Sequence, residues 1–292
     1  MKLKQQLSEF MAASGMNQTQ IATQIGKSPA VVSQYLKGHY RGDNSKLERQ
    51  LKQLMERYQQ KRKNIKLGFV ETQTARRIMR LVSMAHEDCE IQLVIGEAGL
   101  GKTVTLKEYA NDHADVIFIE VEPTFNAKVL LATLCDKLGL GPSRTNHEMF
   151  EAVRAKLNNS GRLLIIDEAE LLQHKPLEIL RRLHDLAGIG VVLAGMPRLR
   201  ANLRGKRGEF KQLYSRVAFA LDLGQRLSDD DLGLMAASAL GTDDHNACLI
   251  DACDGNARRL AKLVRGIKRY ADDSGEPISD KMIEQFSEML IR

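Results

Sequence analysis

The eight residues from Gly96 to Thr103 have the composition and spacing of a loop that cradles phosphate. They follow the apolar run 91–95 and precede a helical pattern, so the loop connects a strand to a helix. Glycines let the backbone approach an anion closely, and the N–H groups at a helix start attract phosphate. We expect Lys102 to reach the β- and γ-phosphates of a nucleotide and Thr103 to hold Mg²⁺. The predicted nucleotide contacts in this loop are Gly96, Glu97, Ala98, Gly99, Leu100, Gly101, Lys102 and Thr103.

Two carboxylates follow a second apolar run. Residues 163–166 have the pattern of a buried parallel strand, and Asp167 and Glu168 come directly after it. We expect Asp167 to complete the Mg²⁺ site, and Glu168 to orient and deprotonate an attacking water molecule. Taken alone, each motif has an ordinary alternative, a glycine-rich turn or a strand end with solvated acids. Together, in this order, they predict a nucleotide site.

The charges of the chain are unevenly distributed. Its 292 residues are enough for about two domains of ~100–200 residues each, and its formal net charge is +6. Residues 1–64 contain 12 Lys and Arg against 4 Asp and Glu, a net charge of +8, whereas residues 65–292 have a net charge of −2. A basic segment on a near-neutral body indicates a module that binds a polyanion. A basic face that only improves solubility is the alternative.

Residues 18–37 contain two short helical patterns separated by a turn. The first ends at Gly26, and the second begins at Ser28-Pro29, where we expect the hydroxyl to cap the helix and the proline to occupy its first position. The pair resembles the helix-turn-helix of phage repressors, although Lys27 stands where such motifs place an apolar residue. The resemblance implies that the second helix enters the major groove of DNA. A small helical bundle that packs against a partner protein is the alternative. The DNA contacts implied for this helix are Ser28, Ala30, Ser33, Gln34 and Lys37.

Strand and helix patterns alternate through the middle of the chain and predict an α/β fold, with a parallel sheet covered on both faces. Expected strands are 91–95, 116–121, 163–166, 189–194 and 217–221, and expected helices are 44–63, one starting at Phe69, 127–138, 147–157 and 177–186. Beyond residue 228 only helical patterns occur, at 231–240, 245–253, 257–270 and 279–291. We therefore expect a helix-turn-helix domain with a basic linker over 1–64, a nucleotide-binding core over 65–224 and a helical lid over 225–292.

The sequence contains no run of ~18 apolar residues and no apolar core of a secretory signal near its start. We expect a cytoplasmic protein, in a bacterial host, that does not bind a membrane. No C-x-x-C pair occurs, so we expect free, buried thiols. The cysteines are Cys89, Cys135, Cys248 and Cys253.

Taken together, the motifs resemble those of AAA+ ATPases over residues 69–275. The resemblance rests on the loop 96–103, the pair Asp167-Glu168, the strand 191–195, the pair Ser215-Arg216 and the segment 255–258. Within that superfamily, residues 69–74 and 38–44 are similar to segments of the phage ATPases that select target DNA for transposition.

This resemblance implies a role for several further residues. Arg216 is similar to the arginine finger that enters a neighbouring subunit's ATP site, and Arg258 to the lid arginine that senses the γ-phosphate. Glu71 and Thr72 match the segment beside the adenine. Met196 stands where a polar residue commonly positions the water, which implies slow hydrolysis. For each arginine, an ordinary surface ion pair is the alternative.

Two further loops are candidate DNA contacts in the ATPase core. In similar ring and filament ATPases the loop after the second strand follows the DNA backbone, which here places Thr124 and Lys128 near phosphate. The basic segment with Arg204, Lys206, Arg207 and Lys211 is a second candidate. Each is also consistent with a solvated loop.

The resulting hypothesis is an ATP- and Mg²⁺-dependent protein that assembles on double-stranded DNA as a helical filament or ring and delivers target DNA to a cognate transposase. Because phosphate contacts supply most of the binding energy, we expect little sequence preference. Two rivals are a replication initiator or helicase loader, and a phage regulator that reads one operator and whose nucleotide site is vestigial.

Overall fold

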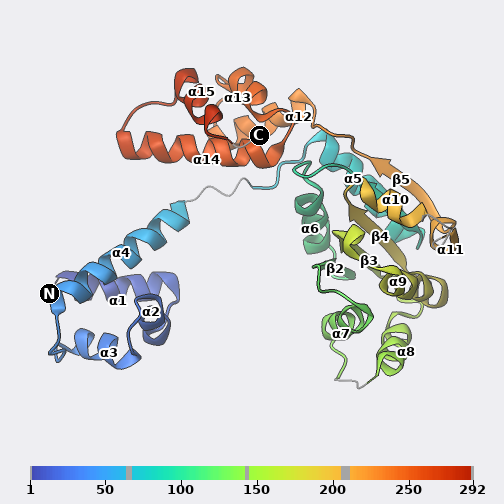
Figure 1. Ribbon diagram of the computed structural model, residues 1–292, viewed down its shortest axis with the longest axis horizontal. Coiled ribbons are helices and arrows are strands. Elements are labelled where there is room, and N and C mark those ends of the chain that lie inside the picture. The colour runs from blue at the N-terminus through green and yellow to red at the C-terminus, as the bar shows by residue number, and fades with distance from the viewer. Residues whose placement is uncertain (1, 64–67, 142–144, 205–210, 291–292) are drawn as a thin grey trace. The chain divides into compact units, whose positions relative to one another are not determined.

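The computed structural model describes residues 2–63, 68–141, 145–204 and 211–290. The chain divides into two compact units, Met1–Lys66 and Leu67–Arg292 (Figure 1). No helix in the described part of the chain is long and apolar enough to cross a membrane.

The N-terminal unit is a bundle of four helices that share one apolar core. Their bounds are α1 (Lys2–Ser14), α2 (Gln18–Gln24), α3 (Pro29–Lys37) and α4 (Asn44–Lys63). Leu7, Ile21 and Leu51 are completely buried in this core. The hydroxyl of buried Tyr35 donates a hydrogen bond to Glu48 Oε1 over 2.8 Å, which joins α3 to α4. Helix α1 was not predicted, because it begins at the second residue, where no capping signal precedes it.

Helices α2 and α3 pack against each other across a short turn, as the helix-turn-helix pattern predicts. Asn17 and Gln20 form a capping box at the start of α2, and Gly26 allows the turn through its φ of +65°. Ser28 occupies the N-cap position of α3 and Pro29 follows it. However, the Ser28 side chain makes no capping hydrogen bond, so that expectation is wrong.

A five-stranded parallel sheet forms the centre of the second unit, in the order β2-β3-β4-β1-β5. The strands are β1 (Ile91–Ile95), β2 (Val116–Glu120), β3 (Leu163–Asp167), β4 (Gly190–Gly195) and β5 (Val217–Asp222). Because β1 and β3 flank β4 and both run parallel to it, their carboxyl ends lie at the same edge of the sheet. The sheet is thus the scaffold for the loop 96–103 and for Asp167.

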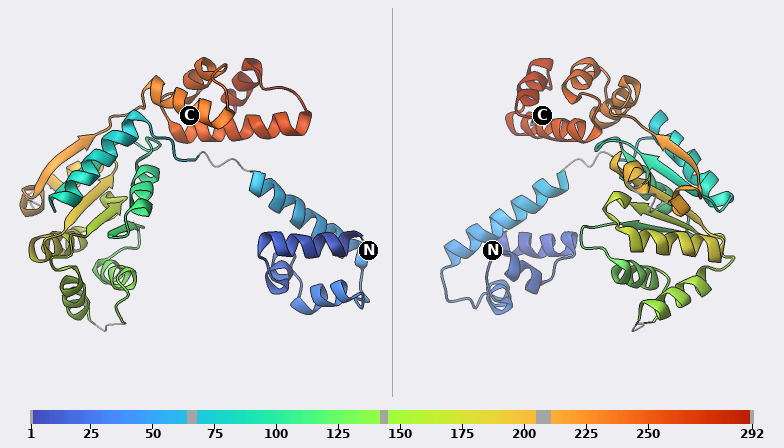
Figure 2. Two further views of the ribbon diagram at one scale, coloured as in Figure 1. Left: turned by 180° about the vertical axis from the view of Figure 1, so that it is seen from behind. Right: turned by 45° about the vertical axis from the view of Figure 1, so that its right-hand side comes forward.

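Helices cover both faces of most of this sheet (Figure 2). One face carries α5 (Gln73–Glu87) and α6 (Lys102–Asp112). The other carries α7 (Ala127–Lys137), α8 (Asn146–Leu157), α9 (His174–Ala187) and α10 (Arg198–Arg204). At the edge strand β5, Ala218, Phe219 and Ala220 are exposed, so the expected cover on both faces is wrong there.

Several local features differ from the sequence-based expectation. The helix expected from Phe69 begins at Gln73, because the Thr72 hydroxyl accepts a hydrogen bond from Ala75 N and caps the helix there. Short helices η1 (Ala169–Leu171), α10 and α11 (Lys211–Tyr214) were not predicted. Helices of one or two turns carry too little periodicity to be recognised from sequence.

Four helices after β5 form a second core of their own. They are α12 (Asp229–Leu240), α13 (Asn246–Cys253), α14 (Ala257–Ser274) and α15 (Asp280–Glu288). Leu100, from the loop after β1, belongs to the same apolar cluster as these helices. The helical lid and the predicted phosphate loop are therefore packed together.

All four cysteines are free, but only two of them are buried. Cys135 and Cys253 are buried as expected, whereas Cys89 and Cys248 are half-buried, so the expectation of four buried thiols is wrong for these two. Burial raises the pKa of the Cys253 thiol to about 12.

Candidate functional site

The loop between β1 and α6 has the backbone of an anion cradle. Gly99 and Gly101 have φ values of +87° and +84°, a region that residues with a side chain avoid. Gly101 is the N-cap of α6, so the loop leads directly into a helix start. At its other end, Gly96 N donates to Gly195 O over 3.2 Å, which fastens the loop to the end of β4.

Lys102 lies inside the curve of this loop. Its Nζ donates to Gly96 O over 2.6 Å and to Glu97 O over 2.9 Å, and the residue is only 8% exposed. Burial lowers the pKa of its ammonium group, while the carboxylates of Asp167 and Glu168 oppose this shift. The cation is thus held where a phosphate bound by the loop would meet it.

Thr103 and Asp167 are in direct contact, although they are 64 positions apart. Thr103 Oγ1 donates to Asp167 Oδ2 over 2.6 Å, and Asp167 Oδ1 accepts from Glu168 N over 3.0 Å. Burial raises the pKa of Asp167, and these two hydrogen bonds oppose the shift. A hydroxyl and a carboxylate are the hard oxygen ligands that Mg²⁺ prefers, and Mg²⁺ commonly takes one or two protein ligands and completes its shell with phosphates and water. The residues therefore fit the predicted ion. No cluster of three or more metal-ligating side chains occurs in the described ranges.

Glu168 has an uncommon backbone conformation. Its φ of +56° and ψ of +33° lie in the left-handed region, which non-glycine residues occupy mainly where the surrounding structure imposes it. The pKa of its carboxyl is raised, first by burial and then by the negative charges of Glu170 and Asp167. The strand end thus fixes the direction of the side chain that is expected to act on water.

Glu170, which was not predicted as a site residue, adds a third carboxylate beside this pair. Its side chain is completely buried, and Oε2 has no hydrogen-bond donor among the described residues. Oε1 lies 3.4 Å from an amino group of Arg198. A β-carbon at Gly195 would overlap Glu170 Oε2, so the glycine before Met196 makes room for this side chain. The only feature of the sequence that could have pointed to Glu170 is its position three residues after Asp167.

The lid contacts the phosphate loop through the start of α14. Asn256 Nδ2 donates to Ala98 O over 3.0 Å, and Ala257 N donates to Gly99 O over 2.9 Å. Asn256 also caps α14, because its Oδ1 accepts from the backbone N–H of Arg258 over 2.9 Å. Arg258 is exposed on this first helical turn. The structure therefore brings α14, the helix of the predicted sensor Arg258, to the phosphate loop. The contact is made through Asn256, whose role was not predicted.

A second lid contact reaches the segment expected beside the adenine. Asp231 of α12, which is 1% exposed, accepts hydrogen bonds from Gln73 N over 2.8 Å and Thr74 N over 3.1 Å. Thr72 is buried as the cap of α5, and Glu71 is exposed and paired with Arg76 over 3.3 Å. No sequence pattern pointed to Asp231, because its partners are backbone groups about 157 positions away.

Arg216 lies in the turn before β5 and is paired within its own chain. Its Nε donates to Asp185 Oδ1 over 3.1 Å, and its side chain is 53% exposed. Asp185 is on α9, and no hydrogen bond of Arg216 in the described structure reaches the phosphate loop. The sequence left two roles open for Arg216, an arginine finger and an ordinary surface ion pair. The ion pair with Asp185 is present in the structure, and the role as an arginine finger stays a prediction.

The predicted DNA contacts occupy three surfaces. On α3, Ser28, Ala30, Gln34 and Lys37 are exposed and Ser33 is half-buried. Thr124 and Lys128 are exposed at the start of α7, where Asn126 caps the helix.

Arg204 was predicted in a basic loop, but it is the last residue of α10 and its guanidinium lies 5.8 Å from the centre of the Tyr214 ring. Lys206 and Arg207 lie outside the described residues, and Lys211 is the first residue of α11. The loop assignment is therefore wrong for Arg204, because the helix of α10 continues to that residue.

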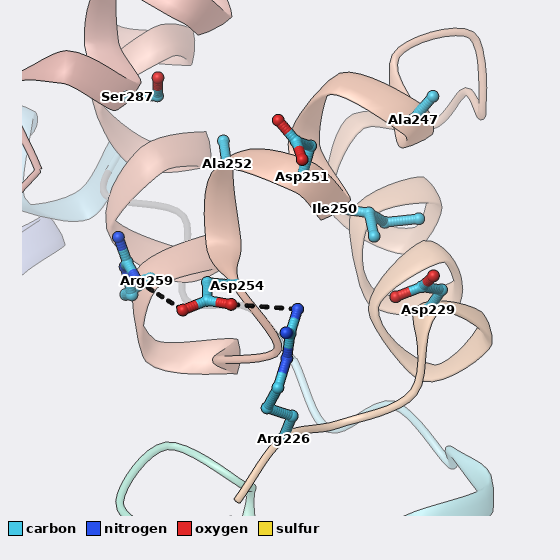
Figure 3. A pocket seen from close by; sticks show the side chains of 9 residues that line it. All are labelled: Arg226, Asp229, Ala247, Ile250, Asp251, Ala252, Asp254, Arg259 and Ser287. Carbon is cyan, nitrogen blue, oxygen red and sulfur yellow. Dashed lines mark ion pairs between the residues drawn. The ribbon is translucent and has the colours of Figure 1, made fainter. Parts of the chain in front are cut away.

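A separate hollow of about 860 Å³ lies within the lid (Figure 3). Arg226 and Arg259 approach Asp254 from two sides there, over 3.0 and 3.7 Å. No residue of the phosphate loop lines it.

Comparison with known proteins decides the family. Residues 85–203 match the family described as AAA domain. The chain is 34% identical over 274 residues to the "ATP-dependent target DNA activator B" of Escherichia phage Mu, an alignment that covers 91% of this chain and 88% of the relative. The chain belongs to the family of phage DNA transposition B proteins. A second B protein, the "Mu-like prophage FluMu DNA transposition protein B" of Haemophilus influenzae, is 30% identical over 250 residues, which are 83% of this chain and 86% of the relative.

Solved structures share the fold of this chain. The Aeropyrum pernix ORC2 protein superposes with a TM-score of 0.57 at 18% identity, covering 73% of this chain and 66% of that chain. Domain III of the Thermotoga maritima replication initiation protein DnaA superposes with a TM-score of 0.52 at 15% identity, covering 75% and 93%. The predicted parallel α/β architecture and the predicted family are both confirmed.

Proposed function

We propose that this protein hydrolyses ATP to control its binding to target DNA, which it activates for a transposase. One observation supports this most strongly: Lys102, Thr103 and Asp167 converge at the end of the sheet, with Thr103 Oγ1 and Asp167 Oδ2 2.6 Å apart. The names of the relatives, target DNA activator and DNA transposition protein, give the proposal its substrate.

Each residue of the site has a proposed task. The backbone N–H groups of the loop and Lys102 bind the phosphates of ATP, and Thr103 and Asp167 hold Mg²⁺, which neutralises phosphate charge when bound. Glu168 orients the attacking water and takes its proton. Arg258 contacts the γ-phosphate from the lid, and Glu71 and Thr72 flank the adenine. Met196 offers no strong hydrogen-bond donor or acceptor to the water, so we expect slow hydrolysis.

Assembly is proposed to complete the site. Arg216 extends into the ATP site of a second copy of this chain, where an arginine supplied in trans is typically worth ~10³–10⁵ in rate. ATP-bound subunits then form a filament or ring on double-stranded DNA. DNA stimulates hydrolysis because it promotes this assembly.

DNA contact is proposed through the exposed face of α3 and the surface with Thr124 and Lys128. Phosphate contacts dominate, so sequence preference is weak. The chain then works in three parts, with 1–64 binding DNA, 65–224 binding ATP and 225–292 acting as the lid, in the bacterial cytoplasm.

Two variants test the ATP site. Lys102→Ala is expected to lose ATP binding, whereas Glu168→Gln is expected to bind ATP but not hydrolyse it, because the two side chains serve the phosphates and the water separately. Lys107→Ala is the matched control: Lys107 lies on the same helix but is paired with Glu120 on the surface. Binding is measured with a fluorescent ATP analogue and hydrolysis as phosphate release. Hydrolysis by Glu168→Gln at the wild-type rate would contradict the assignment of the base.

A strand-transfer assay separates this proposal from its two rivals. Stimulation of strand transfer by a cognate transposase supports it. A footprint at one operator without ATP hydrolysis favours the phage regulator, and loading of a helicase without effect on strand transfer favours the replication protein.

A further inference from the structure

Arg216 has an ordered partner, Asp185, that lies on α9 and not in the phosphate loop. Arg216 uses Nε for this contact, over 3.1 Å, and its two terminal amino groups have no partner among the described residues. A guanidinium carries five N–H donors, and the four on its terminal amino groups can still bind a phosphate through two hydrogen bonds. The ion pair therefore leaves the phosphate-binding end of the side chain available.

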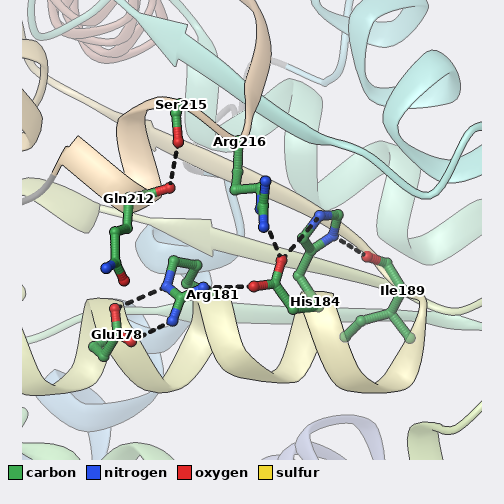
Figure 4. Close-up of polar contacts among 8 residues, drawn as sticks. Glu178, Arg181, His184, Ile189, Gln212, Ser215 and Arg216 are labelled. Carbon is green, nitrogen blue, oxygen red and sulfur yellow. Dashed lines mark hydrogen bonds and ion pairs between the residues drawn. The ribbon is translucent and has the colours of Figure 1, made fainter.

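The carboxylate that holds Arg216 is itself firmly placed. Its other oxygen, Asp185 Oδ2, accepts from Arg181, whose side chain is only 8% exposed. Arg181 is fixed in turn by a fork of two hydrogen bonds to Glu178, as Figure 4 shows. The hydrogen bonds to Glu178 and the charge of Asp185 raise the pKa of the guanidinium of Arg181, so the fork stays charged. Asp185 thus has both oxygens occupied and a rigid support behind it.

We propose that Asp185 is a positioning residue that aims Arg216 at the ATP site of a neighbouring subunit. The inference rests on the proposed function, in which Arg216 acts in trans. An arginine on a turn has many rotamers, and an unrestrained side chain must lose that freedom each time it reaches a phosphate. Because Asp185 binds only Nε, it restricts this freedom before the subunits meet and leaves the four N–H donors of the terminal amino groups available to phosphate.

If Asp185 instead withdrew Arg216 and inhibited the enzyme, Asp185→Ala would raise the rate of phosphate release. A partly exposed ion pair is weak, and its geometry does not cover the terminal amino groups. We therefore expect Asp185→Ala to lower DNA-stimulated phosphate release at saturating ATP by about 2-fold to about 5-fold. The larger figure is the rate equivalent of a strong exposed ion pair, because such a pair can favour the aimed rotamer by no more than its own free energy.

The experiment compares Asp185→Ala, Arg216→Ala and the double variant, with ATP affinity measured beside phosphate release. We expect unchanged ATP affinity in all three, and a double variant no slower than Arg216→Ala, because Asp185 acts only through Arg216. Glu151→Ala is the matched control, since Glu151 also pairs with an arginine along a helix but lies on α8. Asp185→Asn, which keeps the shape and one acceptor oxygen, is expected to lose less activity than Asp185→Ala, and it provides the same test if the alanine variant does not fold.

Mixing of variants separates positioning from a structural defect. Lys102→Ala subunits have an intact Arg216 and Asp185 but no ATP site, so they should restore activity to Asp185→Ala subunits. Arg216→Ala subunits should not, because neither variant supplies a positioned arginine. If Arg216→Ala is impaired while Asp185→Ala and Asp185→Asn work at or above the wild-type rate, the positioning role is wrong. If Arg216→Ala itself hydrolyses ATP normally, the arginine finger of the proposed function is wrong instead.

Discussion

Replacement of Asp231 by alanine should loosen the first turn of α5, which directly follows the residues expected beside the adenine, Glu71 and Thr72. The carboxylate is 1% exposed and accepts from Gln73 N and Thr74 N over 2.8 and 3.1 Å. A buried N–H left without an acceptor costs about 1–3 kcal/mol. Two such groups would cost about 2–6 kcal/mol, and because both hydrogen bonds are only partly buried, water will compensate for some of the loss. We therefore take about 2 kcal/mol, which is about 30-fold in the equilibrium for local opening.

Amide hydrogen exchange read by mass spectrometry measures this directly. Peptides that contain Gln73 and Thr74 should exchange about 30-fold faster in Asp231→Ala than in the wild type. Asp230→Ala is the matched control, because Asp230 is the exposed neighbour on the same helical turn and should leave the exchange unchanged. Equal protection in the two variants would refute the reasoning, since the carboxylate would then contribute nothing to the amides it contacts.

Three further outcomes are expected. Gln92→Met should raise the free energy of unfolding, measured by urea denaturation, by about 1–3 kcal/mol. The reason is that Gln92 is completely buried in β1 and that neither polar atom of its side-chain amide has a hydrogen-bond partner in the described ranges. A variant less stable than the wild type would show that the amide has a partner. Cys253 should resist alkylation at pH 9 in the native protein and react in urea, as read by mass spectrometry, because its raised pKa of about 12 keeps the folded thiol protonated. The free energy of unfolding should fall as the pH rises from 9.0 toward about 12, because the thiol ionises in the unfolded state over this range and not in the folded state. Equal labelling of the native and the urea-unfolded protein would contradict the burial of Cys253. Deletion of residues 1–64 should flatten the slope of log affinity for DNA against log salt by ~0.9 for each DNA phosphate that this segment neutralises; an unchanged slope would assign the basic segment to protein contact.

The sequence predicts the site where the chemistry is local or follows a strongly patterned strand. The strand 91–95 has the same bounds in the structure, and the loop after it lies between strand and helix as predicted. The pairing of Thr103 with Asp167 could be anticipated because Asp167 ends one buried strand of the parallel sheet and the loop before Thr103 follows another. Asp231 could not be, since its partners are backbone N–H groups that any sequence provides.

Helix boundaries were less predictable than the strands. Thr72 sets the start of α5 at Gln73 by capping it, although the apolar pattern begins earlier. Asp185 could not be recognised, because in the sequence it resembles any other acid on the outer face of an amphipathic helix. Its significance comes from Arg181 and Arg216, and only the fold brings Arg216 to it.

The hydrogen bonds between the start of α14 and the phosphate loop restrict how these proteins can be recombined. Gly99 has a left-handed backbone, and a β-carbon there would overlap the Asn256 side chain, so the two positions are compatible only as a pair. A lid transplanted from a relative with a larger residue at the position of Asn256 would press on the loop, even if both parent proteins are active on their own. In chimaeras of this family, the loop and the first turn of α14 should therefore be inherited as one block, and the crossover point belongs before the phosphate loop or beyond the lid.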